Sequence, residues 1–151
     1  MNKKILAFVC DGEKFLLLRN NSKDPAHGGD YWFTVTGSVE AGESIENAVK
    51  REVKEETNLD VSEIFYLKWS SVYSWGGEDH SENNFLAFVK KGNILLNEEH
   101  VAFEWLNLDN FIEKINWDLN KDELKKVLQK AVKRELFFKK EKIDEFRKKV
   151  A

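Results

Sequence analysis

The chain has 151 residues, of which 34% are charged and 42% hydrophobic, and its formal net charge is −3. This length predicts one domain, residues 1–151, that can bury a hydrophobic core. The small negative charge argues against nucleic acid or an anionic membrane as an obligatory partner. The only cysteine is Cys10, which excludes a disulfide within the chain. No apolar run approaches the ~18 residues of a membrane span, so we expect a cytoplasmic protein.

The first part of the chain has the pattern of short buried strands. An apolar run predicts a strand at Ile5–Cys10, a hairpin turn follows at Asp11–Lys14, and Phe15–Arg19 is the expected return strand. The stretch Asn20–Asp30 contains glycine and proline and predicts a loop. We expect a further strand at Tyr31–Thr36.

The middle of the chain continues with strands and then a helix. Side chains rich in β-branched and aromatic types predict one long strand, or two in sequence, at Val61–Trp75. The next strand is expected at Asn84–Lys90. An acidic loop then leads through a short strand into a helix near Leu108–Ile115.

Apolar residues at helical spacing continue from Lys121 to the last residue, which predicts amphipathic helices over residues 121–151. This C-terminal extension either covers the sheet or forms a contact in a homodimer. It holds twelve Lys or Arg and six Asp or Glu, a balance of +6. These charges are either the solvated face of a helix or a surface for RNA or a membrane.

A helix is predicted from about Ser44 to Thr57. Ser44 is a suitable N-terminal cap, and no proline interrupts the segment. Four apolar residues fall on one arc when each residue advances by about 100°. These residues, which should face the core, are Ile45, Ala48, Val49 and Val53.

Acidic residues interrupt this apolar arc. Glu52 and Glu56 project into the middle of the arc, and Glu55 lies at its edge. Like charges four residues apart cost roughly 0.2–0.5 kcal/mol, and the helix dipole disfavours anions near the C-terminal end by about 0.3–1 kcal/mol each. A divalent cation would cancel these penalties together. The alternative is a solvated acidic helix end balanced by Lys50, Arg51 and Lys54.

The order of residues between positions 37 and 59 resembles the signature of the Nudix hydrolases. That signature combines a glycine, an acid, an Arg-Glu pair, an aliphatic residue, a Glu-Glu pair, a second glycine and a final aliphatic residue. The chain departs from it at Asn58, where the family has glycine; both residues tolerate the left-handed conformation past a helix end. The matching positions are Gly37, Glu43, Arg51, Glu52, Val53, Glu55, Glu56 and Leu59.

The resemblance implies an α/β fold in which a mixed β-sheet lies between helices, and a divalent metal, Mg²⁺ or Mn²⁺, at the carboxylates. The implied metal ligands are the Gly37 carbonyl, Glu52, Glu55 and Glu56. The implied general base is a helix glutamate, Glu55 or Glu56, or else Glu99 in the acidic loop before the later strand.

Other matched residues have implied supporting roles. Arg51 would orient the carboxylates for catalysis, and Glu43 would pair within the loop and helix that bind the substrate. Arg19, at the end of an apolar strand, is either a contact to a substrate phosphate or part of a surface salt bridge.

The implied reaction is hydrolysis of a diphosphate bond. The Trp32–Glu40 run and Glu99-His100 resemble the branch that cleaves dihydroneopterin triphosphate and dATP to a monophosphate and pyrophosphate. Tyr73 and Trp75 are candidates for stacking on the base or pterin. One alternative is a dinucleoside polyphosphate hydrolase, and a second is a non-catalytic domain that binds nucleotides or RNA.

Overall fold

The computed structural model describes residues 2–20 and 31–135, apart from the side chains of residues 68–73 and 75. The strands are β1 (Asn2–Cys10), β2 (Phe15–Asn20), β3 (Trp32–Phe33), β4 (Val35–Ser38), β5 (Val61–Trp75), β6 (Glu78–Val89) and β7 (His100–Leu106), and the helices are α1 (Ile45–Thr57), α2 (Leu108–Lys114) and α3 (Lys121–Val132). Of the loop predicted at Asn20–Asp30, Asn20 belongs to β2 and residues 21–30 lie outside the described ranges, as do residues 136–151 of the predicted C-terminal extension.

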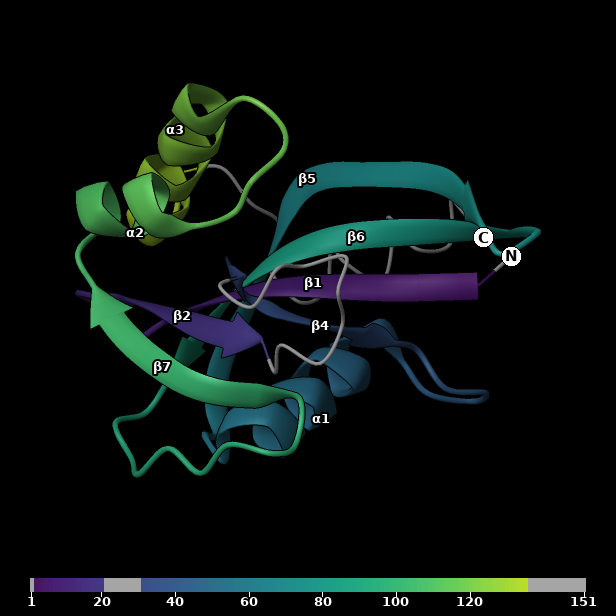
Figure 1. Ribbon diagram of the computed structural model, residues 1–151, viewed down its shortest axis with the longest axis horizontal. Coiled ribbons are helices and arrows are strands. Elements are labelled where there is room, and N and C mark those ends of the chain that lie inside the picture. Colours follow the sequence, from purple (N-terminus) through teal and green to yellow (C-terminus); the bar gives the residue numbers. More distant parts are fainter. Residues whose placement is uncertain (1, 21–30, 136–151) are drawn as a thin grey trace.

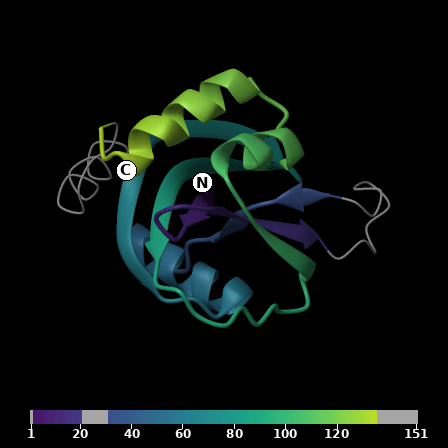
Figure 2. The same cartoon turned by 90° about the vertical axis from the view of Figure 1, so that its left-hand side faces the viewer.

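The sheet is mixed and lies between two helical layers. Helix α1 lies against one face, and α2 and α3 lie against the other (Figures 1 and 2). Side chains alternate between the two faces of a strand, so each strand contributes to both cores. Ile5 and Ala7 of β1 pack with Val49 of α1, whereas Leu6 and Phe8 pack on the side of α2 and α3. The predicted α/β/α arrangement is therefore confirmed.

The predicted strand at Tyr31–Thr36 is broken at Thr34, because its two halves have different partners. Phe33 in β3 pairs with Leu18 of β2, whereas Val35 in β4 pairs with Ala7 of β1. Strands β1 and β2 run in opposite directions, and β3 and β4 are each antiparallel to their partner. A chain that satisfies both must bend between its halves. Thr34 lies at this bend, and its hydroxyl donates to the Ala7 carbonyl at 2.6 Å.

The long hairpin of β5 and β6 extends the sheet on the other side of β1. Strand β5 is continuous over the predicted range, with a register irregularity between Tyr66 and Ser70. Strand β6 begins at Glu78, earlier than the expected Asn84, because its polar first half pairs with β1 in parallel and with β5 antiparallel. Backbone pairing on both edges thus imposes the strand on a segment that lacks an apolar pattern.

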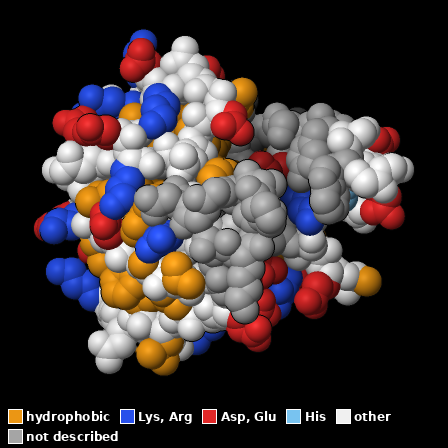
Figure 3. Space-filling model, in the orientation of Figure 1, with side chains coloured by type: hydrophobic (Ala, Val, Ile, Leu, Met, Phe, Trp, Pro, Cys, Tyr) orange, Lys and Arg blue, Asp and Glu red, His pale blue; other side chains and the backbone are white. Residues whose placement is uncertain are grey.

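The face of the molecule that Figure 3 draws combines scattered charges with an apolar region. Figure 3 shows apolar side chains over β7 and the loop before it, where Leu95, Val101 and Phe103 are exposed. Within the described ranges, no helix has the length and hydropathy needed to cross a membrane.

Candidate active site

Helix α1 begins and ends where its local chemistry predicts. The Ser44 hydroxyl accepts a hydrogen bond from the Asn47 backbone amide at 3.1 Å, which caps the first turn. Asn58 adopts the left-handed conformation with φ of 68°, and its amide donates to the Lys54 carbonyl at 2.9 Å. These two ends fix the length of the helix and the direction of its acidic side chains.

Glu56 is buried at the end of the apolar arc, as the helical spacing predicted. Its side chain is 1% exposed, and its Oε2 has no hydrogen-bond partner among the described residues. Burial, reinforced by the charges of Glu99, Glu52 and Glu55, raises the pKa of this carboxyl to about 10. A buried carboxyl with an unsatisfied oxygen is costly unless a cation or donor reaches it.

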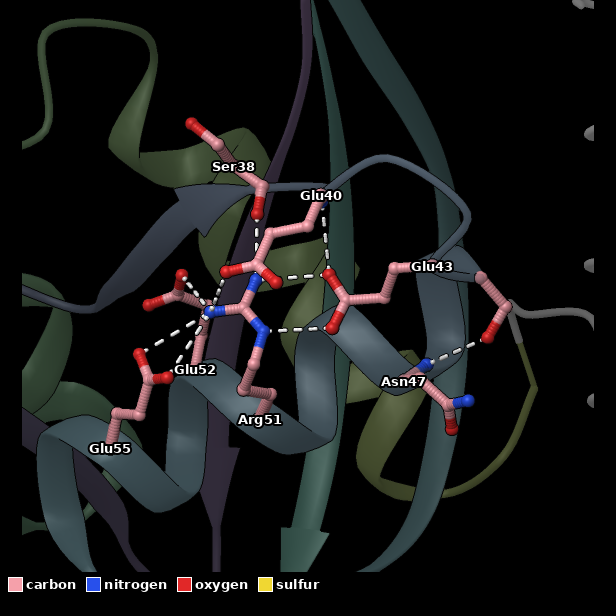
Figure 4. A network of polar contacts seen from close by, with 8 residues as sticks. Ser38, Glu40, Glu43, Asn47, Arg51, Glu52 and Glu55 are labelled. Carbon is pink, nitrogen blue, oxygen red and sulfur yellow. Dashed lines mark hydrogen bonds and ion pairs between the residues drawn. The ribbon is translucent and has the colours of Figure 1, made fainter.

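Arg51 holds the acidic side chains around it in fixed positions (Figure 4). Its Nε donates to Glu43 at 2.7 Å, and its Nη1 donates to Glu52 at 2.9 Å and to Glu55 at 3.3 Å. Its Nη2 donates to the Ser38 carbonyl at 2.8 Å, which ties the helix to the loop after β4. The guanidinium holds the pKa of Glu43 below its usual range, whereas burial raises the pKa of Glu52 despite Arg51.

Gly37 allows the carboxylate of Glu52 to lie directly against β4. A Cβ atom at this position would lie 2.1 Å from Glu52 Cδ and 2.3 Å from Glu52 Oε1. Any other residue would therefore push the Glu52 side chain away. The glycine of the sequence motif is required here for close approach, and its φ is not in the left-handed region.

The start of β7 brings two more polar side chains to Glu56. His100 Nε2 lies 2.7 Å from Glu56 Oε1, so the two groups share one proton in a buried hydrogen bond. Burial lowers the pKa of His100, and a backbone contact with Arg19 opposes this shift. Glu99 is exposed, and Glu56, Glu99 and His100 each place one ligand atom within 4.8 Å of the others. At the level of sequence, His100 enters only through the resemblance of Glu99-His100 to one branch of the family, and its contact with Glu56 was not predicted.

A cavity of about 1010 Å³ lies beside these groups. Its lining includes Gly37, Glu52, Glu56, Glu99 and His100, and also Lys4, Tyr31, Phe33, Thr34 and Thr36, among others. Carboxylate oxygens are the ligands that hard divalent cations prefer. The unsatisfied oxygen of Glu56 and the Glu52 carboxylate seated over Gly37 fit such a cation, which would relieve the crowding of negative charge.

The family of the chain follows from its match to a known domain. A model of the NUDIX domain matches residues 2–128, which is most of the chain. The chain belongs to the NUDIX domain family.

The relatives of this Nudix chain are named for several different enzymatic activities. An NAD-capped RNA hydrolase, NudC, of Mannheimia succiniciproducens is 34% identical over 107 residues, which are 70% of this chain and 39% of that protein. The dihydroneopterin triphosphate diphosphatase of Escherichia coli is 31% identical over 119 residues, covering 68% of this chain and 75% of that protein. This chain thus spans about two fifths of the length of the NudC relative.

A solved structure shows the same Nudix fold. The Ap4A hydrolase of C. elegans superposes with a TM-score of 0.63 at 24% identity, covering 87% of this chain and 95% of that one. At this identity the likeness concerns the fold, and it supports the arrangement of sheet and helices described above.

Four residues expected at the Nudix site are not among the described residues that line the cavity: Arg19, Glu43, Arg51 and Glu55. Glu55 has a side chain that is 53% exposed and faces Arg51. Arg19 lies on β2 between Leu18 and Asn20, which do line the cavity. The side chains of Tyr73 and Trp75, the expected stacking partners, lie outside the described part of the chain.

Proposed function

We propose that this chain is a divalent-metal-dependent pyrophosphohydrolase. Its substrate would be a triphosphate of the dATP or dihydroneopterin triphosphate type, cleaved to a monophosphate and pyrophosphate. The observation that carries this proposal is the buried Glu56, which has one unsatisfied oxygen and lines a large cavity together with Glu52 and Glu99. The supporting comparison is the similarity to a dihydroneopterin triphosphate diphosphatase over 68% of the chain.

Glu52, Glu56 and the Gly37 carbonyl would hold Mg²⁺ or Mn²⁺, with Glu55 at the outer side. The cation supplies charge neutralisation on the phosphate oxygens and lowers the pKa of a bound water. The chain must keep several carboxylates close together before the metal arrives. Arg51 does this through its contacts to Glu52 and Glu55.

Glu99 is the best-placed group to accept a proton from the attacking water. Glu56 is engaged by His100 at 2.7 Å, and Glu55 faces Arg51 on the exposed side of the helix. Glu99 lines the cavity, is exposed and lies close to Glu56. A carboxylate in this position can accept a proton from a nearby water.

The test is a hydrolysis assay over a panel of substrates with product analysis. The panel contains dATP, dGTP, dihydroneopterin triphosphate, diadenosine tetraphosphate and NAD, each with Mg²⁺, with Mn²⁺ and with chelator. We expect metal-dependent release of pyrophosphate from a triphosphate. Preferential release of nucleoside triphosphate from diadenosine tetraphosphate would instead make the chain a dinucleoside polyphosphate hydrolase. Nucleotide binding without hydrolysis of any compound would make it a binding domain.

A further inference from the structure

On the face of the sheet that carries α2 and α3, strands β1 and β6 also carry polar side chains. Strands β1 and β6 pair in parallel, so that Lys4 lies opposite Glu82 and Leu6 lies opposite Asn84. Leu6 and Leu86 both belong to the core on the side of α2 and α3. Since side chains alternate along a strand, Lys4, Glu82 and Asn84 point to that same side.

Asn84 is a buried polar side chain whose amide oxygen is unsatisfied. It is 7% exposed, and its Oδ1 has no hydrogen-bond partner among the described residues. The next positions on the same face are Leu86 and Phe88, which are apolar core residues. A leucine would therefore suit the fold better than an amide whose oxygen is unsatisfied. A donor supplied by a ligand would remove this defect.

Glu82 lies beside Asn84 on the same face, and its carboxyl is withdrawn from water. Burial raises the pKa of this carboxyl, and the nearby Lys4 opposes the shift. Glu82 lies directly opposite Lys4 across the pair of strands β1 and β6. Lys4 and Tyr31 both line the cavity that holds the metal-binding carboxylates.

Aromatic rings line the same cavity. The rings of Tyr31 and Phe33 lie 5.7 Å apart, and Phe33 stacks on Trp117 at 6.1 Å with an angle of 20° between planes. Tyr31 and Phe33 line the cavity. Phe33 and Trp117 pack against the core on the side of α2 and α3, which is the side that the polar groups of β1 and β6 face. Such rings bind a flat heterocycle by stacking.

We propose that Asn84, Glu82 and Lys4 recognise the heterocycle of the substrate, and that they select a 2-amino-4-oxo ring, guanine or pterin, over adenine. The Asn84 oxygen and the Glu82 carboxylate are hydrogen-bond acceptors, whereas Lys4 is a donor. The edge of guanine or pterin presents a ring N–H and an amino group beside a carbonyl, which matches this set. Adenine presents an acceptor nitrogen in place of the ring N–H and leaves an acceptor unpaired. This inference rests on the proposed function for its substrate class, and of the two types of triphosphate proposed there it favours dihydroneopterin triphosphate over dATP.

The experiment compares ring types in binding and in hydrolysis. Binding of GMP and AMP is measured by calorimetry in chelator, and kcat/KM is measured for dGTP and dATP with Mn²⁺. The wild-type protein should favour the guanine compound about tenfold or more in both assays. Asn84→Leu should lose this preference without a lower Tm, because leucine satisfies the core. Asn83→Ala, on the opposite face of β6, should retain it.

Each result decides one question. The recognition proposal would be overturned if the wild-type protein bound AMP as tightly as GMP or more tightly. An unchanged preference for the guanine compound in Asn84→Leu would also overturn it. Hydrolysis without a ring preference would overturn it while leaving the pyrophosphohydrolase intact. A clear preference for GMP in a protein that hydrolyses nothing would support ring recognition and refute the proposed reaction. Glu82→Gln is the second variant: it should weaken the preference, and its failure to do so would count against the proposal.

Discussion

The individual carboxylates of α1 differ in their surroundings, and this difference sets their roles. Glu55 is half exposed beside Arg51, Glu52 is largely covered, and Glu56 is fully buried. Burial disfavours the charged form of a carboxyl because water no longer solvates it. The buried Glu56 is therefore the residue whose charge depends most on a bound cation, and the residue whose replacement is most informative.

Replacing Glu56 by glutamine should separate function from stability. The variant Glu56→Gln keeps the shape of the side chain but cannot carry a negative charge, so we expect turnover to fall by about 100-fold or more. Its Tm in chelator should equal or exceed that of the wild type, because glutamine is neutral without taking up a proton on burial. Turnover assays and thermal unfolding check this. Glu113→Gln, an exposed glutamate of α2, is the control, and wild-type activity in Glu56→Gln would refute the metal assignment.

The same residue predicts how stability depends on pH without metal. The folded-state pKa of Glu56 is about 10, against an ordinary value of 4.5, so the folded protein holds an extra proton between these values. The free energy of unfolding should therefore fall as pH rises, by at most about 1.4 kcal/mol per unit. Denaturant titrations in chelator between pH 7 and 9 avoid the titration of His100 below and of Cys10 above. Glu56→Gln should show a smaller slope, and equal slopes would contradict the burial argument.

Gly37 should affect the metal more than the fold. In Gly37→Ala the new methyl group would displace the Glu52 carboxylate, because 2.1 Å to its Cδ is far inside contact distance. We expect the dissociation constant for Mn²⁺ to rise about tenfold or more, with a small change in Tm. Calorimetric titration with Mn²⁺ measures this. Gly92→Ala is a matched control, since its Cβ would lie at an ordinary 3.5 Å from Leu59; equal affinities in both variants would exclude the close-approach role.

At the scale of elements, features set by neighbours in sequence were predictable and features set by distant partners were not. The ends of α1 follow from Ser44 and Asn58, and the inward direction of Glu56 follows from helical spacing. The bend at Thr34 and the pairing of His100 with Glu56 depend on strands far away along the chain. The early start of β6 at Glu78 has the same cause, because polar residues became a strand through their partners.

The C-terminal end of α1 gives a prediction at this scale. Asn58 has φ of 68°, a conformation that glycine adopts without strain. Asn58→Gly should change the free energy of unfolding by less than about 0.5 kcal/mol, whereas Asn58→Ala should lower it by about 1 kcal/mol. Denaturant unfolding of the two variants tests this order. A large fall in the free energy of unfolding of Asn58→Gly would mean that the side-chain contact to the Asn93 carbonyl matters more than the left-handed backbone conformation.

For the whole molecule, the metal site should couple binding to folding. The carboxylates come together only in the folded chain, so a cation that binds there stabilises the folded state by mass action. Mn²⁺ at about 100 times its dissociation constant should raise Tm by roughly 5–10 °C for a domain of this size. Thermal unfolding with and without Mn²⁺ measures the shift. Glu56→Gln should show little shift, and an equal rise in both proteins would place the cation elsewhere.

The bend at Thr34 joins two tasks in one short piece of chain. Phe33, just before the bend, is one of the aromatic rings that line the cavity. Gly37, just after the bend, leaves room for the Glu52 carboxylate. A single hydrogen bond to Ala7 anchors the corner between them. Any movement of this corner would shift both ends of a bound molecule at once. A redesign that makes room beside the aromatic rings should therefore keep Thr34 and its hydrogen bond. Otherwise a bound substrate would be misaligned with the carboxylate at Gly37.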